Sequence, residues 1–199
     1  MVSNPGGKRA VFLDRDGTVN ILKPGEYVFH KRDLRLHNGA AQAIRSLNLL
    51  GYLVIIVTNQ GVVAREKASE KTIEEFHEEL IKRLKKKGVK LDAIYYCPHH
   101  PDGTHKKLGI VCKCRKPEIG MIKEAAKKFK IDLKRSFLVG DSTSDIAAGN
   151  KAGLTTIAVK TGYAGKDGKH KAKPDLVARN LPEAVKLIRG LALLTGKPK

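Results

Sequence analysis

Two carboxylates, Asp14 and Asp16, directly follow a short apolar run at residues 11–13 and precede Gly17 and Thr18. A short apolar run bounded by a turn signal predicts a buried strand, and Asp-Gly predicts that the chain leaves the sheet there. In an α/β sheet, ligands bind just outside the carboxyl ends of the strands. One carboxylate placed there can attack phosphorus, while the second protonates the leaving oxygen and later activates water. The alternative is a strand that ends in an ordinary Asp-Gly turn.

Three further polar clusters follow predicted strands or loops, at Thr58-Asn59, Arg115-Lys116 and Asp141. Because the carboxyl ends of parallel strands meet at one edge of a sheet, we expect these clusters to converge with the two acids. The Thr58 hydroxyl and nearby backbone N–H groups can hydrogen-bond phosphoryl oxygens, and Lys116 can place a positive charge beside them. Taken alone, Lys116 is equally well explained as a solvated cation before a helix, and Asp141 as a turn residue.

A phosphate dianion repels a carboxylate nucleophile, so the predicted site needs positive charge. Mg²⁺ suits this role because it is held by one or two carboxylates together with substrate oxygens and water. We predict that the side chains of Asp14 and Asp141 ligate Mg²⁺, with Asp145 behind them. Asp16 must be protonated to act as an acid, so we expect the Asp14 and Asp16 pair to titrate as one coupled unit.

All three cysteines of the chain lie in one segment: Cys97, Cys112 and Cys114. In a protein expected to be cytoplasmic, clustered Cys and His favour zinc over disulfides. Cys97-x-His99 and Cys112-x-Cys114 together predict a closed, structural Cys₃His zinc site. His100 and His105 remain competing ligands, because spacing alone does not exclude them.

Alternating strands and helices must position these residues. Strands are predicted at 11–13, 53–57, 93–96, 136–139, 155–159 and, shorter, 176–177. Helices are predicted at 40–50, 69–87, 117–129, 146–152 and 182–194. The core stripe of the 69–87 helix is expected at Ile73, Phe76, Leu80, Ile81 and Leu84, with i,i+4 ion pairs Glu78–Lys82 and Glu79–Arg83. This order predicts an α/β protein with a parallel, helix-covered sheet.

Two irregular segments accompany these elements. Residues 21–38 are long for a plain connection and are expected to reach over the site. Residues 162–174, rich in Gly and Lys, are expected to form a mobile loop.

The chain has 199 residues, which suits one domain over residues 1–199 with the zinc loop 97–114 inserted. No apolar run is long enough to cross a membrane, and the polar start from Met1 to Lys8 predicts no signal peptide, hence a cytoplasmic protein. The net charge is +19, from 39 basic against 20 acidic residues. Solvated helix faces account for most of it; nucleic acid is possible but not favoured, because Trp is absent and aromatics do not interleave with Arg.

The stretch Phe12 to Asn20 resembles the D-x-D-G-T motif of the haloacid dehalogenase (HAD) superfamily of phosphohydrolases. The resemblance identifies Thr58, Lys116 and Asp141 with the second, third and fourth motifs of that superfamily. It implies Asp14 as the nucleophile, Asp16 as proton donor and acceptor, and the backbone carbonyl of Asp16 as a third Mg²⁺ ligand. The implied fold is a HAD-like Rossmannoid sheet with helices on both faces and a minimal cap.

The segments Tyr95 to Pro101 and Cys112 to Pro117, with twelve residues between His99 and Cys112, resemble the D-glycero-D-manno-heptose-1,7-bisphosphate phosphatases. This implies a small phosphorylated sugar as substrate, bound by Asn59, Gln60 and Arg115. The chain departs from that pattern twice. It has Ser142 where a Lys is common, and Gly61-Val62 where Ser-Gly is usual, which leaves the exact substrate and its anomer open.

Other functions remain as alternatives. Histidinol-phosphate phosphatases carry the same zinc ligands with a shorter loop between them. Polynucleotide 3′-phosphatases carry a similar T-N-Q segment, and an inactive nucleic-acid-binding module is a fourth option. The oligomeric state does not follow from the sequence, and a monomer is favoured.

Overall fold

The computed structural model describes residues 6–195. Six parallel strands form one sheet in the order β3-β2-β1-β4-β5-β6. The strands are β1 (Ala10–Leu13), β2 (Leu53–Asn59), β3 (Ala93–Cys97), β4 (Phe137–Gly140), β5 (Thr155–Val159) and β6 (Leu176–Ala178). The helices are α1 (Ala40–Leu49), α2 (Glu70–Lys85), α3 (Gly120–Phe129), α4 (Thr143–Ala152) and α5 (Leu181–Thr195), with 3₁₀ turns η1 (Lys31–Asp33) and η2 (Leu133–Arg135). The predicted α/β class is confirmed.

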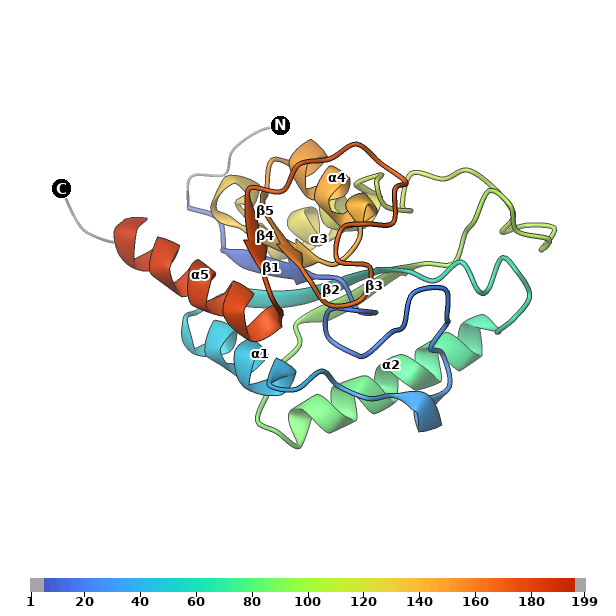
Figure 1. Ribbon diagram of the computed structural model, residues 1–199, viewed down its shortest axis with the longest axis horizontal. Helices are drawn as coiled ribbons and strands as arrows, with labels where there is room; N and C mark the ends of the chain where they lie inside the picture. Colours follow the sequence, from blue (N-terminus) through green and yellow to red (C-terminus); the bar gives the residue numbers. More distant parts are fainter. Residues whose placement is uncertain (1–5, 196–199) are drawn as a thin grey trace.

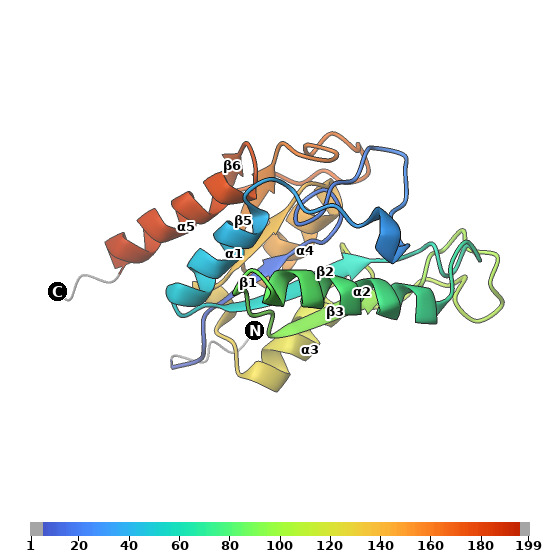
Figure 2. The ribbon, with the colours of Figure 1, turned by 90° about the horizontal axis from the view of Figure 1, so that it is seen from below.

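Helices cover both faces of the sheet, with α1, α2 and α5 on one side and α3 and α4 on the other (Figures 1 and 2). Alternate residues of β1 serve the two faces: Val11 and Leu13 pack in the cluster with α1, α2 and α5, and Phe12 packs in the cluster with α3. All four residues of β1 are buried. The continuous apolar runs therefore reflect strands that are covered on both faces.

The chain order of the strands reverses beside β1, since β2 lies on one side of it and β4 on the other. In a doubly wound sheet, connections leave in opposite directions at such a point and open a crevice at the carboxyl ends of the strands. Asp14 follows β1 and Asp141 follows β4 directly, so both acids stand at this crevice.

Details of the helices differ from the predictions. The third helix begins at Gly120, not at Pro117, because residues 117–119 still belong to the turn that carries Lys116 to the crevice. Ile81 is 44% exposed and lies outside the core stripe of α2, while His77 is buried there. Lys82 pairs with Glu79 rather than Glu78, whereas the predicted Arg83–Glu79 pair forms at 2.7 Å.

Residues 21–38 pass over the carboxyl edge of the sheet, as expected. Gly25 N donates a hydrogen bond to the Tyr163 hydroxyl, so this segment meets the segment that follows β5. Within residues 6–195, no helix is long and apolar enough to span a bilayer. Most of the polar stretch Met1 to Lys8 lies outside the described residues.

Candidate active site and metal centre

A buried lysine joins the residue after β1, strand β2 and helix α4. The Lys116 ammonium donates to Asp14 Oδ1 at 2.6 Å, to Asp145 Oδ1 at 2.5 Å and to the Val57 carbonyl at 2.7 Å. Lys116 itself is only 4% exposed. Burial alone would lower the pKa of this amine, but the two carboxylates raise it, so Lys116 stays charged. The sequence prediction placed Asp145 only behind the site, whereas the structure makes it a direct partner of Lys116.

Three carboxylates form a compact oxygen cluster around this lysine. Single oxygens of Asp14, Asp141 and Asp145 all lie within 4.8 Å of one another, and the three residues are buried. An all-oxygen donor set of this size suits a hard ion such as Mg²⁺. Gly17, at φ +81°, makes the cluster possible, because a Cβ there would lie 2.4 Å from Asp141 Oδ2. A fit to Mg²⁺ follows from the donors themselves.

Burial, together with repulsion from neighbouring acids, raises the pKa values of Asp14 and Asp141. Burial, together with Asp145 and Asp16, raises the pKa of Asp14 to about 7 although Lys116 opposes the shift. Burial, Asp14 and Asp145 raise the pKa of Asp141 to about 8. A divalent cation removes this repulsion when it binds, and its binding requires the ionised forms.

These raised pKa values predict a pH-dependent stability. In unfolded chains carboxyls ionise near pH 4, whereas Asp14 and Asp141 ionise near pH 7 and 8 in the fold. Between about pH 4 and pH 8, the metal-free folded state therefore binds more protons than the unfolded chain does. Its free energy of unfolding consequently falls as the pH rises through this range. In magnesium-free buffer we expect a melting temperature at least about 5 °C lower at pH 8 than at pH 5.5.

Adding Mg²⁺ should restore most of that difference at pH 8 and change little at pH 5.5. Dialysis is preferable to a strong chelator, which would also strip a zinc site. The variant Asp141→Asn should flatten the pH dependence. Equal melting temperatures at both pH values in magnesium-free buffer would contradict the assignment.

Asp16 is held apart from this cluster by its own partners. Its carboxylate accepts from Arg15 Nε at 2.9 Å and Arg15 Nη2 at 2.7 Å, from Gln60 at 2.9 Å and from Asn20 at 3.0 Å. Burial would raise the pKa of Asp16, but Arg15 and these amides hold it below its usual value. The pKa values of Asp14 and Asp16 are thus shifted in opposite directions, and the charge of Asp16 contributes to the raised pKa of Asp14. Titration of the two acids as one coupled unit stays a prediction.

Arg15 was not predicted as a site residue, because nothing in the sequence distinguishes it from the other basic residues of the chain. Its side chain is completely buried, lies over the Phe76 ring at 4.3 Å and contacts His77 Nε2 at 3.0 Å. Burial and Arg15 lower the pKa of His77 to about 3, so that imidazole is neutral. Phe76 and His77 of helix α2 therefore hold Arg15 in place beside Asp16.

The side-chain amides of Asn59, the last residue of β2, and of Gln60 form hydrogen bonds within the protein. Asn59 binds both sides of the Lys116 backbone, donating to its carbonyl and accepting from its N–H at 3.0 Å each. Gln60 is buried and donates to Thr58 Oγ1 at 2.8 Å as well as to Asp16. These bonds position Lys116 and Asp16. Substrate contacts of Thr58, Asn59 and Gln60, which all line the cavity, stay predictions.

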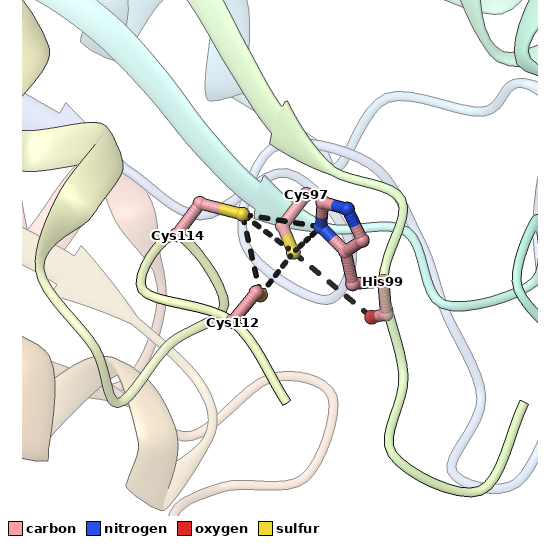
Figure 3. Close-up of side chains that lie close together, drawn as sticks. All are labelled: Cys97, His99, Cys112 and Cys114. Carbon is pink, nitrogen blue, oxygen red and sulfur yellow. Dashed lines mark hydrogen bonds between the residues drawn. The ribbon is translucent and has the colours of Figure 1, made fainter. Parts of the chain in front are cut away.

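The Cys/His cluster forms at the end of β3 (Figure 3). The sulfurs lie 3.5 Å (Cys97–Cys112), 3.3 Å (Cys112–Cys114) and 3.1 Å (Cys97–Cys114) apart, and His99 Nδ1 lies 3.3–3.5 Å from two of them. A tetrahedral zinc with Zn–S bonds of about 2.3 Å would set its sulfurs about 3.8 Å apart, so the four donors fit zinc with small adjustments. His100 contacts Arg65 and His105 accepts from backbone N–H groups, so neither belongs to the cluster.

This cluster predicts about one zinc per chain, measurable by elemental analysis after purification. Cys112→Ser should lose most of the zinc and lower the melting temperature, because a structural zinc contributes directly to folding. His105→Ala is the matched control and should keep its zinc. Full zinc content in Cys112→Ser would show that the metal is held elsewhere.

A cavity of about 680 Å³ opens above the carboxylates. Asp14, Thr58, Lys116 and Asp141 line one end. Cationic and polar side chains line the other parts of its wall: Arg65, His100, Arg115, Lys169 and His170. This arrangement suits an anionic ligand with more than one charged group.

Glycine at position 61 permits a close approach on that wall. A Cβ at Gly61 would lie 2.9 Å from His100 Cδ2 and 3.2 Å from Arg115 Nη1. Arg115 also donates to the His99 carbonyl at 3.1 Å, which ties it to the Cys/His loop. The departure at position 61 thus brings His100 and Arg115 nearer to the T-N-Q turn than a larger residue would.

Comparison with known proteins agrees with this geometry. Residues 113–184 match the model of the HAD-hydrolase-like family. A D-glycero-β-D-manno-heptose-1,7-bisphosphate 7-phosphatase of Pasteurella multocida (strain Pm70) is 41% identical over 186 residues, which cover 92% of this chain and 98% of the relative. The chain belongs to the heptose-1,7-bisphosphate 7-phosphatase family of HAD-like phosphatases.

Members of this family differ in the anomer they are named for. A relative from Photorhabdus laumondii, 40% identical over 181 residues and covering 90% of this chain and 96% of its own, is named for the α anomer. The solved D,D-heptose 1,7-bisphosphate phosphatase of B. bronchiseptica, complexed with magnesium and phosphate, has a TM-score of 0.79 and 30% identity over 92% of this chain and 99% of its own. The HAD-like fold predicted from the motifs is confirmed.

Proposed function

We propose that this chain is a Mg²⁺-dependent phosphomonoesterase that removes the C7 phosphate of D-glycero-D-manno-heptose 1,7-bisphosphate. The observation that carries the proposal is the joining of Asp14, Lys116 and Asp141 at one end of a cavity whose wall also holds Arg65 and Arg115. One phosphate of a bisphosphate would bind at the end formed by Asp14, Lys116 and Asp141, and the other would bind at the wall that holds Arg65 and Arg115. The names of the relatives support this substrate.

In the proposed reaction, the ionised carboxylate of Asp14 attacks phosphorus, forming an aspartyl phosphate as the bond from phosphorus to the sugar oxygen breaks. Asp16 gives its proton to the leaving oxygen. Asp16 then takes a proton from water, which attacks phosphorus and releases phosphate and free Asp14. Lys116 stays within reach of the transferring oxygens, because it already contacts Asp14. Mg²⁺, held by Asp14, Asp141 and the Asp16 carbonyl, would neutralise phosphoryl charge.

The low pKa of Asp16 matters for the first half of this reaction. The ionised form is suited to accept a proton from water, but the leaving oxygen needs the protonated form. We propose that Asp16 takes a proton from solvent when the substrate dianion enters and the side chain turns away from Arg15. Arg15 and Gln60 then restore the ionised form between the two halves.

The test is a phosphate-release panel with Mg²⁺. It contains both anomers of the heptose bisphosphate, fructose 1,6-bisphosphate, histidinol phosphate and a 3′-phosphorylated oligonucleotide. We expect a heptose bisphosphate to have the highest kcat/KM and ³¹P NMR to show that the C1 phosphate remains. Preference for histidinol phosphate or for the oligonucleotide would replace the proposal with one of those activities.

We further propose that the protein is monomeric and acts in the cytoplasm. All three cysteines gather with His99 as a candidate zinc site, and such a use of cysteine is typical of proteins from a reducing compartment. Size-exclusion chromatography with light scattering tests the monomer, and a mass of two chains would overturn it. Fractionation of the source cells tests the location.

A further inference from the structure

The segment between β5 and β6 is fastened to the start of helix α4. Asp167 accepts hydrogen bonds from Thr143 N at 2.8 Å and from Thr143 Oγ1 at 3.0 Å. His170 N donates back to Thr143 Oγ1 at 3.1 Å. Tyr163 N donates to Asp141 Oδ2 at 2.7 Å, so the same segment also meets the carboxylate cluster. Residues 163–170 therefore pack against the site, and the mobility expected from the composition of residues 162–174 stays a prediction.

Lys169 lies inside this fastened stretch, between Asp167 and His170. It is exposed and lines the cavity, with its ammonium 5.8 Å from the centre of the Tyr163 ring. Both carboxylate oxygens of Asp167 are taken by Thr143, and within residues 6–195 Lys169 has no carboxylate partner within 4.0 Å. Burial, Arg115 and Arg65 lower the pKa of His100, with a smaller contribution from Lys169, so Lys169 and Arg115 both lie near this side chain of the cavity wall. Lys169 is thus a free cation facing the cavity.

Position 142, next to Thr143, holds a serine in this chain. Its hydroxyl donates to Asp145 Oδ2 at 2.7 Å and caps helix α4, so it offers no positive charge to a ligand. The tie through Thr143 brings residues 167–170 to the start of α4, and Ser142 and Lys169 both line the cavity. Lys169, from the segment between β5 and β6, can therefore supply the positive charge that Ser142 at the start of α4 does not.

We propose that Lys169 binds the phosphate that is not cleaved, together with Arg115 across the cavity. This inference rests on the proposed function, because it assumes a substrate with two phosphates. The phosphate that reacts goes to Asp14 and Lys116, which lie at the buried end of the cavity. Lys169 is a specificity residue in this scheme, since it favours bisphosphates over monophosphates without touching the reacting atoms.

The test compares Lys169→Ala with the wild type on heptose 1,7-bisphosphate and on p-nitrophenyl phosphate, which lacks a second phosphate. We expect KM for the bisphosphate to rise about tenfold, kcat to change less than about twofold, and kcat/KM for p-nitrophenyl phosphate to stay within about twofold. Lys169→Arg should keep most of the affinity, and Lys169→Glu should raise KM further. Lys166→Ala is the matched control, because Lys166 is exposed on the same segment and lies outside the cavity lining.

An unchanged KM in Lys169→Ala, or an equal rise in Lys166→Ala, would overturn the assignment of Lys169 alone. A wild-type chain that releases no phosphate from either heptose bisphosphate anomer would overturn the proposed function and this inference with it. The wild-type measurement therefore separates the two failures.

Discussion

Replacing Asp14 by Asn should lower phosphate release by at least about 10⁴-fold, the scale seen when a covalent nucleophile is removed. The amide keeps the shape of the carboxyl but cannot attack phosphorus as an anion. Asp14 is only 8% exposed and its carboxylate contacts Lys116, so the proposed nucleophile lies beside the cation that would stabilise the transferring oxygens. Steady-state kinetics on heptose bisphosphate with Mg²⁺ measures the loss.

The fold should survive this change, because Lys116 keeps Asp145 and the Val57 carbonyl as partners. Circular dichroism and zinc content should match the wild type. Asp33→Asn is a suitable control for the loss of one carboxylate, since Asp33 is exposed on η1, away from the site. Turnover of Asp14→Asn within tenfold of the control would remove Asp14 as the nucleophile.

Replacing Lys116 by Met should damage both activity and stability. The change leaves Asp14 and Asp145 buried without their shared cation, and breaking such a buried pair costs about 3–5 kcal/mol. It also removes positive charge from the transferring oxygens, which we expect to lower kcat about 10²–10³-fold. Urea unfolding in magnesium-free buffer and phosphate-release kinetics measure the two effects.

A second substitution separates the two roles of Lys116. Asp145→Asn in the Lys116→Met background removes one unpaired charge and should recover part of the lost stability without recovering turnover. Lys123→Met, on the exposed face of α3, is the matched control and should change neither. Equal stability of Lys116→Met and the control would contradict the buried ion network.

The fold was predictable because its signals are local. The apolar runs of β1, β2, β4 and β5 are almost entirely buried, and short continuous apolar runs of this kind are typical of parallel strands covered on both faces. Helix boundaries depended on more distant contacts. The turn that brings Lys116 to β2 is fixed by Asn59, 57 residues away, and it delays the start of α3 to Gly120. Ile81 has the period of a core residue, but only the packed fold leaves it exposed.

The site was predictable where residue type alone limits the chemistry. Paired acids after a strand, and Cys and His at ligand spacing, have few other uses. Arg15 was not predictable in this way, because a buried arginine and a surface arginine look the same in sequence. The same holds for Lys169, whose segment has the composition of a loose loop. The contact between Thr143 and Asp167, 24 residues apart, fixes this segment beside the site, and a contact between such distant residues cannot be predicted from a local sequence pattern.

The central claim is that Asp14 carries the phosphoryl group. Enzyme turning over heptose bisphosphate with Mg²⁺ is quenched in acid, reduced with borohydride, digested and sequenced by mass spectrometry. An aspartyl phosphate is reduced to homoserine, so we expect homoserine at position 14 only when substrate and Mg²⁺ are both present. Homoserine at position 16, 141 or 145, or none at any position during turnover, would contradict the account.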